Sequence, residues 1–295
     1  MKPIVSLFII CFSLVGFSQT VDTYTYTVKG MDTLKLDVYT PEDILPDERL
    51  PVLLWMHGGG FSIGSRDFID DAELCKYAAQ NGYIGISISY RLLRKGTTTG
   101  FGCDCPKEEK METFKQAAID YLDAAAFVVA NAEQLKIDPR YIIAGGSSAG
   151  AEGTLNAVFM REYFVDHLEK YQDVQFAGIF SCAGAVVNAQ YITKNNAIPG
   201  VFYHGTSDGL VPYGTASHHL CAPEKPGYLI LDGANVIVDK LESFEMPFYV
   251  HIVKGGGHEV SAIPFTELDK VFGFFNQTVL GNEVIQTKVI KTKRE

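Results

Sequence analysis

A serine flanked by glycines is the strongest chemical signal in the sequence. The chain carries the run Gly146-Ser147-Ser148-Ala149-Gly150 directly after an apolar stretch at residues 141–144, and helix-forming residues follow. A sharp strand-to-helix turn of this kind holds a serine with its hydroxyl projected, while the flanking glycines avoid collisions with the neighbouring strand and helix. Ser147 is an alternative, but only Ser148 has a glycine two residues before and two after it. We predict Ser148 as a nucleophile; the alternative is a tight structural turn.

A serine nucleophile needs a base, and the base needs an acid. Serine is weakly nucleophilic at its own pKa, so a histidine must take its proton, and an aspartate then fixes the imidazole tautomer. Asp208 follows an apolar run at residues 201–204, and His258 stands in a glycine-rich segment after the run at residues 248–253. We predict His258 as the base and Asp208 as the acid. The alternative for Asp208 is a residue that only shapes its turn.

A triple-glycine segment, Gly58-Gly59-Gly60, follows the apolar run at residues 52–56. Acyl transfer places negative charge on the carbonyl oxygen, and fixed backbone N–H groups stabilise that charge. We predict an oxyanion hole formed by the N–H groups of Gly59, Gly60 and Ala149. His57 is expected to brace this loop through a side-chain hydrogen bond.

The other histidines and carboxylates near these motifs are expected to have supporting or unrelated roles. His204 is expected to support its turn, and His251, inside a predicted strand, to be satisfied in the core or at the surface. Neither His218 nor His219 has an evident partner in the sequence. The remaining candidates, expected to be solvated or to act only indirectly, are Asp239, Glu242, Glu152 and Glu259.

Apolar runs that alternate with helical periodicity predict the elements that position these groups. Alternating residues on either side of Lys29–Asp32 predict an antiparallel hairpin. The expected strands are 23–28, 33–39, 52–56, 83–90, 141–144, 176–182, 201–204 and 248–253, and the expected helices are 67–80, 111–135, 149–160, 235–244 and 265–276. This order predicts an α/β fold with a mostly parallel central sheet, an N-terminal antiparallel hairpin and helices on both faces. Sites in such sheets form at the carboxyl ends of strands, where all the candidate groups fall.

Two long segments, Arg91–Lys110 and Leu210–Pro247, follow strands on the expected active-site side. Loops of this length are more often functional than idle, so we expect them to wall a substrate pocket. Between them they hold Cys103, Cys105 and Cys221, and we expect one of the first two to pair with Cys221. No metal is expected, because the segment lacks further ligands at zinc-site spacing.

The N-terminus predicts a secretory signal peptide over residues 1–18, followed by a single domain over 19–295. Lys2 precedes an apolar run at residues 4–17, and Gly16 and Ser18 provide small residues before a cut. The run is too short for a membrane span of roughly 20 residues. We therefore expect a secreted or periplasmic protein with no stable membrane insertion. Apart from the cysteine in the signal peptide, Cys75 and Cys182 are the cysteines outside the two long segments.

The charge balance argues against nucleic acid as a partner. The formal net charge is −10, and it becomes −11 when Lys2 leaves with the signal. No basic stripe with interleaved aromatic residues occurs. A small basic tail at Lys288, Lys291, Lys293 and Arg294 is expected to be a solvated end.

Together these motifs resemble the α/β-hydrolase superfamily, in particular its carboxylesterases and feruloyl- or acetyl-xylan-esterase-like enzymes. The order serine, aspartate, histidine along the chain is that of this fold. The resemblance covers roughly residues 30–275 and rests on His57-Gly-Gly-Gly-Phe61, Gly146-Ser-Ser-Ala-Gly150, His204-Gly-Thr-Ser-Asp208 with Val211-Pro212, Gly-Gly-His258, Leu34–Pro41 and Ser89–Leu92. It implies a serine ester hydrolase that needs no cofactor and acts on small-molecule or carbohydrate esters. Phe61 and Ala151 stand where many relatives carry tryptophan and glycine, which affects the expected shape of the pocket.

Two other functions are compatible with the same motifs. The segment from His204 to Pro212 also resembles prolyl-oligopeptidase-like serine peptidases, although those usually carry a large gating domain that we do not expect here. Some proteins with this fold only bind partners, but they typically lack one of the three residues, and here Ser148, Asp208 and His258 are all present.

Overall fold

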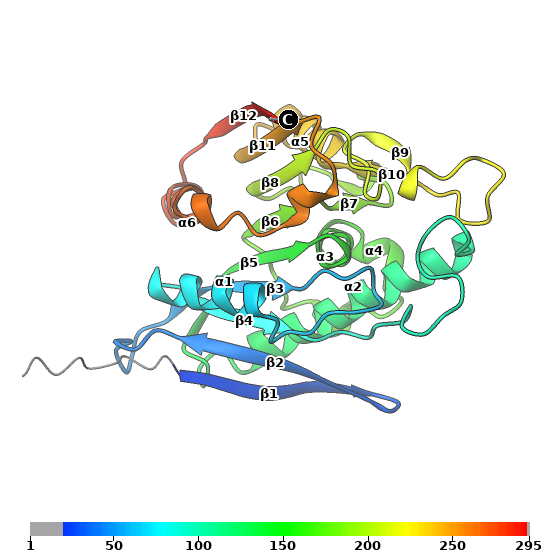
Figure 1. Ribbon diagram of the computed structural model, residues 1–295. Helices are drawn as coiled ribbons and strands as arrows, with labels where there is room; N and C mark the ends of the chain where they lie inside the picture. Colours follow the sequence, from blue (N-terminus) through cyan, green and yellow to red (C-terminus); the bar gives the residue numbers. More distant parts are fainter. Residues whose placement is uncertain (1–19, 294–295) are drawn as a thin grey trace, which may run out of the picture.

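A central nine-stranded sheet organises the chain. The computed structural model describes residues 20–293, so the predicted signal peptide lies outside the described residues. The strand order is β1-β2-β4-β3-β5-β6-β8-β11-β12, and the sheet runs from β1 at the bottom of Figure 1 to β12 at the top. All strands from β4 onward in that order are parallel, and β2 pairs antiparallel with both of its neighbours, β1 and β4. The strands are β1 Thr20–Lys29, β2 Asp32–Thr40, β3 Leu50–Met56, β4 Ile84–Ile88, β5 Ile137–Ser147, β6 Gly178–Cys182, β8 Gly200–Gly205, β11 Phe248–Lys254 and β12 Gln286–Thr292.

Helices cover both faces of this sheet, as its buried apolar strands require. One core lies between the sheet and α2, α3 and α5, and a second core lies between the sheet and α1 and α6. In Figure 1, α1 and α6 lie on one side of the sheet, at the left of the view. The helices are α1 Ile69–Gln80, α2 Lys107–Ala130, α3 Ala149–Phe159, α4 Arg161–Phe164, α5 Ala234–Ser243 and α6 Leu268–Phe275.

The predicted N-terminal hairpin is confirmed. Strands β1 and β2 pair from Thr20 with Thr40 to Lys29 with Asp32, so Gly30 and Met31 form a two-residue turn. Gly30 has a φ of 62°, in the left-handed region that glycine enters without steric cost. The hairpin therefore caps one edge of the parallel sheet through β2, which pairs with β4.

Two parts of the fold differ from the sequence-based predictions. A second, three-stranded sheet, β7-β10-β9, has no counterpart among the predicted strands; its strands are β7 Ala185–Val186, β9 Thr215–Ser217 and β10 Ile230–Gly233. The basic tail contains a strand that the sequence analysis did not predict: residues 286–292 form β12 in parallel register with β11, and Lys288 and Lys291 stay exposed on it. Its lysines pair with acidic side chains on three other segments: Lys288 with Glu242, Lys291 with Glu267 and Lys293 with Glu259.

A buried hydrogen bond ties α1 to the sheet beside the site described below. The indole N–H of Trp55, on β3, donates to Asp71 Oδ1 on α1 at 2.6 Å. Trp55 is fully buried and Asp71 is 6% exposed. Burial is the main reason why the pKa of Asp71 rises to about 6, and the charge of Asp70 adds to the effect. The folded protein therefore favours the protonated form of this carboxyl.

This raised pKa makes the folded state lose stability as pH rises through about 6, because the unfolded chain ionises Asp71 more easily. Asp71→Asn keeps an acceptor for Trp55 and removes the ionisation. We expect the variant to melt several degrees above the wild type at pH 7.5, with the difference shrinking towards pH 4. Asp239→Asn, at an exposed position on α5, is the control. Thermal melts at both pH values test this prediction. A difference in melting temperature between variant and wild type that does not depend on pH contradicts it.

Candidate active site

A sharp turn between β5 and α3 carries the predicted nucleophile. Strand β5 ends at Ser147 and α3 begins at Ala149, so Ser148 alone forms the turn. Ser148 has φ 50° and ψ −123°, a conformation that costs a non-glycine residue free energy and persists only when its surroundings enforce it. Its backbone N–H donates to the carbonyl of Cys182 on β6 at 2.8 Å. The neighbouring strand therefore helps to hold the turn.

The two glycines that flank Ser148 are required by close backbone packing, as predicted. A Cβ on Gly150 would lie 2.1 Å from the carbonyl oxygen of Met56, at the end of β3. A Cβ on Gly146 would lie 2.5 Å from the backbone of Gly150, in the first turn of α3. Real Cβ atoms never approach backbone this closely, so neither position accepts a side chain without moving the turn.

The three predicted catalytic side chains meet at the carboxyl ends of β5, β8 and β11. The hydroxyl of Ser148 lies 2.7 Å from Nε2 of His258 and donates to it. On the other side of the ring, Nδ1 of His258 donates to Asp208 Oδ2 at 2.8 Å. These residues are 110 and 50 positions apart in the chain. The structure therefore brings together the serine, the histidine and the acid that the sequence predicted.

Asp208 is held as a carboxylate by its hydrogen bonds. Its Oδ1 accepts the backbone N–H groups of Leu210, at 2.8 Å, and Val211, at 3.0 Å. Burial raises the pKa of this carboxyl, but the hydrogen bonds from His258 and Leu210 outweigh burial, and the net pKa lies below the usual value. The side chain is therefore ionised at neutral pH while it receives the imidazole N–H.

His204 supports this turn, as expected. It is fully buried, and its Nε2 donates to the carbonyl of Val211 at 3.1 Å. Burial lowers the pKa of His204, so its ring is neutral at pH 7. A neutral ring 3.6 Å from Asp208 Oδ2 leaves that oxygen to His258.

The glycine loop lies opposite Ser148 in the same cavity. The backbones of Gly59, Gly60 and Ala149 line a cavity together with Ser148 and His258. Within residues 20–293, none of these three backbone N–H groups donates to a protein acceptor. Gly59 has a φ of 118°, and a Cβ there would lie 2.1 Å from the carbonyl oxygen of Ile63, so only glycine fits this turn. The three N–H groups are thus available to an oxyanion.

His57 braces the glycine loop rather than facing the serine. Its Nδ1 donates to the carbonyl of Gly58 at 2.7 Å, and its ring packs against Tyr90 with 4.6 Å between ring centroids. The Tyr90 hydroxyl returns a hydrogen bond to the carbonyl of His57 at 3.0 Å. The predicted bracing role is confirmed.

The cavity at Ser148 has a volume of about 360 Å³ and is walled by the two long loops, as predicted. Phe101 comes from the segment after β4, and Leu210, Val211, His218 and His219 come from the segment after β8. A disulfide between Cys103 and Cys221 joins these segments next to the cavity. The expected pairing with Cys221 is confirmed, and Cys103 is the partner; Cys105 is a buried free thiol, as are Cys75 and Cys182.

A second hollow, of about 590 Å³, is also lined by the glycine loop. It shares Gly58, Gly59, Ser147 and Ser261 with the first cavity. The side chains that distinguish it include four apolar ones, Ile63, Phe68, Ala262 and Ile263, together with His57, Asp70, Asp71 and Glu259. Ile63 and Phe68 are 70% and 54% exposed, which leaves apolar surface open to a ligand.

Sequence reasoning gave no direct role in the site to three polar residues that line the first cavity. Glu152, His218 and His219 all line it, and Nε2 of His218 lies 3.5 Å from Glu152 Oε1. The expectation that His218 has no partner nearby is therefore wrong. Glu152 stands 66 positions before His218, and no local pattern in the sequence connects them.

The other secondary candidates lie away from the cavity or in structural contacts. His251 donates to Glu267 Oε2 at 2.9 Å and stacks on Tyr203, so it is a satisfied buried histidine, as expected. Asp239 is exposed and accepts a hydrogen bond from Asn235. Glu259, beside His258, pairs with Lys293 at 2.5 Å.

Neither metal binding nor membrane spanning is indicated by the described part of the chain. Between residues 20 and 293, no three histidine, cysteine or acidic side chains are grouped to hold a metal ion. No helix in that range is both long and apolar enough to cross a bilayer.

Comparisons with known proteins give a match to one family model over less than half of the chain, similarity to esterases and a common fold. Residues 36–178 match the family model described as BD-FAE. Gut esterase 1 of Caenorhabditis elegans is 34% identical over 141 residues, and a liver carboxylesterase of Sus scrofa is 32% identical over 122 residues. These alignments cover 48% and 41% of this chain but only 23% and 20% of the relatives, so the chain matches less than a quarter of either relative's length.

Solved structures extend the likeness to most of the chain. Esterase 2 of Thermogutta terrifontis, in a structure phosphoramylated by tabun, superposes with a TM-score of 0.64 and 17% sequence identity. The superposition covers 87% of this chain and 94% of the esterase. The chain therefore has the α/β-hydrolase fold, and just under half of it is similar in sequence to the two esterases.

Proposed function

We propose that this esterase-like α/β-hydrolase cleaves carboxylic esters, on small acyl groups or on carbohydrates, through an acyl-enzyme formed on Ser148. The observation that carries the proposal is the unbroken line of hydrogen bonds from the Ser148 hydroxyl through His258 to Asp208, at 2.7 Å and 2.8 Å, on the wall of a cavity. Hydrogen-bonded serine, imidazole and carboxylate in this geometry are the groups that nucleophilic acyl transfer requires.

Acylation begins with the Ser148 hydroxyl. Its oxygen attacks the ester carbonyl carbon while Nε2 of His258 takes the proton, and the Asp208 carboxylate stabilises the imidazolium that forms. The carbonyl oxygen becomes an oxyanion beside the N–H groups of Gly59, Gly60 and Ala149. A single donor of this kind is worth about 2.7–4 kcal/mol in acyl-transfer enzymes. His258 then gives its proton to the departing alkoxide, and the alcohol leaves.

Deacylation repeats these steps with water as the nucleophile. His258, neutral again, takes a proton from water as the water oxygen attacks the acyl carbon. The same three N–H groups receive the second oxyanion. Collapse of this intermediate returns the proton to Ser148 and releases the carboxylic acid.

We also propose that the protein works outside the cytoplasm, in the periplasm or the medium. The signal-peptide pattern in residues 1–18 supports this, although those residues lie outside the described part of the chain. The Cys103–Cys221 disulfide supports it independently, because such bonds persist mainly in oxidising compartments. An ester that reaches this compartment is the expected partner, and the acidic net charge of −10 does not favour nucleic acid.

A fluorophosphonate probe tests the proposal directly. We expect the folded protein to be labelled at Ser148, located by peptide mass spectrometry, and to hydrolyse p-nitrophenyl acetate. Prior incubation with a slow ester substrate is expected to delay the labelling. Organophosphorus modification of Thermogutta terrifontis esterase 2, a protein of the same fold, supports the choice of probe. Absence of labelling in folded protein would favour a non-catalytic binding role.

A substrate panel separates an esterase from a peptidase. Acetyl, butyryl, feruloyl and long-chain acyl esters are compared with dipeptide amides at equal concentration. We expect ester cleavage to exceed amide cleavage. The opposite order would indicate a prolyl-oligopeptidase-like serine peptidase.

A further inference from the structure

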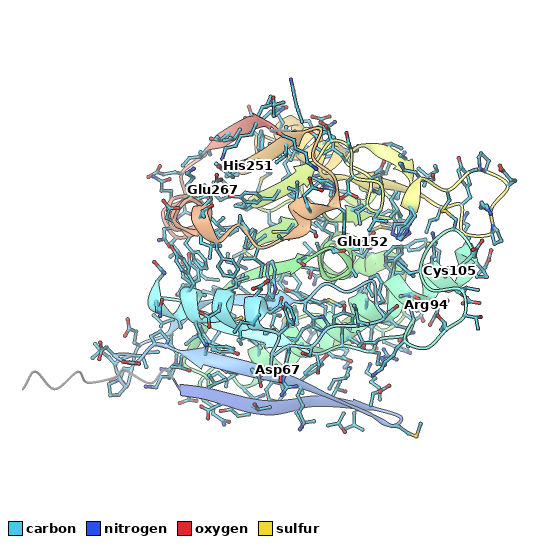
Figure 2. The ribbon with its side chains drawn as sticks, viewed as in Figure 1. Asp67, Arg94, Cys105, Glu152, His251 and Glu267 are labelled. Carbon is cyan, nitrogen blue, oxygen red and sulfur yellow. A yellow bond between two sulfur atoms is a disulfide. The ribbon has the colours of Figure 1, made fainter. Side chains whose placement is uncertain are left out.

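The cavity at Ser148 has one polar side, formed by Glu152 and His218. Glu152 lies in the first turn of α3, four residues after Ser148, in the middle of the molecule (Figure 2). His218 begins the turn that follows β9. Both side chains line the cavity, and their relative exposures are only 2% and 1%. No step of the proposed reaction uses either of them.

Each of these side chains has a buried atom without a hydrogen-bond partner. In the described part of the chain, Glu152 Oε1 and His218 Nδ1 are both buried and unpaired. Their mutual contact of 3.5 Å, from His218 Nε2 to Glu152 Oε1, is too long for a good hydrogen bond. Unpaired polar atoms are rare in protein interiors because burying them costs free energy, and each one calls for an explanation. A ligand group in the cavity would provide one.

The charge state of the pair limits the ligand group it would bind. Burial, together with the negative charge of Asp208, raises the pKa of Glu152 well above its usual value. Burial lowers the pKa of His218 well below its usual value, and His219 and Lys110 lower it further. Both shifts favour the uncharged forms, a carboxylic acid and a neutral imidazole, each of which offers a donor and an acceptor. A hydroxyl group, which both donates and accepts, complements them; a charged group does not.

The surrounding residues hold the His218 ring in place. Phe101 and Phe114 contact the ring edge-on, with centroids 5.1 Å and 5.9 Å away. The Cys103–Cys221 disulfide joins the backbone on either side of this contact, between the segment that carries Phe101 and the segment that carries His218. Lys110, fully buried, donates to the carbonyl of Gly227 at 2.8 Å and fixes the end of the same segment. The nitrogen atoms are therefore positioned before any ligand arrives.

From this arrangement we propose that Glu152 and His218 form a subsite that selects esters carrying a hydroxyl group on the arm that enters the cavity at Ser148. The proposal rests on the ester hydrolysis proposed above and names its substrate class. The second hollow, with its apolar Ile63, Phe68 and Ile263, accommodates the other arm. Because a site built to bind a hydroxyl discriminates strongly against the analogue that lacks it, the effect is measurable as a selectivity ratio.

Two matched pairs of esters test the proposal. Glyceryl monoacetate and propyl acetate differ by hydroxyls on the alcohol arm, and ethyl 3-hydroxypropionate and ethyl propionate differ by one on the acyl arm. We expect the wild type to prefer the hydroxylated member of one pair by about tenfold or more in kcat/KM. The pair that shows this preference identifies whether the alcohol arm or the acyl arm enters the cavity at Ser148. A ratio within twofold in both pairs overturns the proposal.

Variants test whether Glu152 and His218 cause the preference in kcat/KM for the hydroxylated ester. His218→Phe keeps a ring among Phe101 and Phe114 and removes both nitrogens, so the ratio should fall towards one. Glu152→Leu should have the same effect and serves if His218→Phe does not fold, whereas Glu152→Gln, a neutral donor and acceptor, should retain much of the ratio. His167→Phe, at an exposed histidine, is the matched control. An unchanged ratio in His218→Phe or Glu152→Leu overturns the assignment.

A binding measurement keeps this test separate from the test of catalysis. If the wild type hydrolyses no ester, the proposed function fails, and the subsite is judged by calorimetry on Ser148→Ala protein. Tighter binding of the preferred hydroxylated ester than of its analogue, lost on adding His218→Phe, supports the subsite. Equal binding of both members of each pair overturns it.

Discussion

Replacing Ser148 with alanine is expected to reduce kcat for p-nitrophenyl acetate by about 10⁶-fold, the order of magnitude known for loss of a serine nucleophile. The side chain contributes the attacking oxygen, which lies 2.7 Å from the base, and no other hydroxyl is hydrogen-bonded to His258 in residues 20–293. The turn at φ 50° is held by backbone packing around Gly146 and Gly150 and does not depend on the hydroxyl. The variant should therefore fold normally.

Stopped-flow and steady-state assays measure this loss, and circular dichroism checks the fold. Ser147→Ala is the informative comparison, because Ser147 is the adjacent serine and also lines the cavity. It should lose far less activity than Ser148→Ala. Activity that survives in folded Ser148→Ala protein would mean that another group is the nucleophile.

Replacing Asp208 with asparagine is expected to lower kcat by about 10⁴-fold, as the same change does in serine proteases. Oδ2 of Asp208 receives the proton on Nδ1 of His258, which leaves Nε2 free to accept the proton of Ser148. An amide N–H in that position would favour the other tautomer. The buried carboxylate would also no longer stabilise the imidazolium. Oδ1 would still accept the N–H groups of Leu210 and Val211, so the turn should persist.

The rate of acyl-enzyme formation measures the effect of Asp208→Asn. Asp239→Asn, on the exposed face of α5, removes a carboxylate without touching the cavity and should retain wild-type rates. If Asp208→Asn retained a tenth or more of the wild-type kcat, a different acid would have to orient His258.

The local parts of the site were predictable because short sequence patterns determine them. The turn at Ser148 needs glycine at 146 and 150, and both glycines stand against backbone with no room for a side chain. The apolar runs before Gly58, Ser148, Asp208 and His258 are buried strands that end at the same side of the sheet. Parallel strands therefore converted separate motifs into one cluster.

The parts that could not be predicted depend on contacts between distant segments. Strand β9 has three residues and β7 has two, so neither shows a period, and their pairing with β10 joins segments many positions apart. Strand β12 was not predicted because its lysines made the segment resemble a solvated tail. These lysines lie on an edge strand and pair with acidic residues elsewhere. The choice between Cys103 and Cys105 depended on which of them faces Cys221, and Cys105 is turned into the core with no exposed surface.

The cross-link between the two cavity loops has a practical consequence for producing the protein. It joins residues 118 positions apart. In the chain-entropy model, a link across a loop of that size raises the free energy of the unfolded state by about 4 to 5 kcal/mol, because it lowers the entropy of the unfolded chain. Material made in a reducing host, or purified with thiol reagents, would lack this restraint next to the nucleophile. Samples intended for screening should therefore be expressed by an oxidative route. Mass spectrometry should confirm the Cys103–Cys221 bond and unmodified thiols at Cys75, Cys105 and Cys182 before a weak activity is taken as genuine.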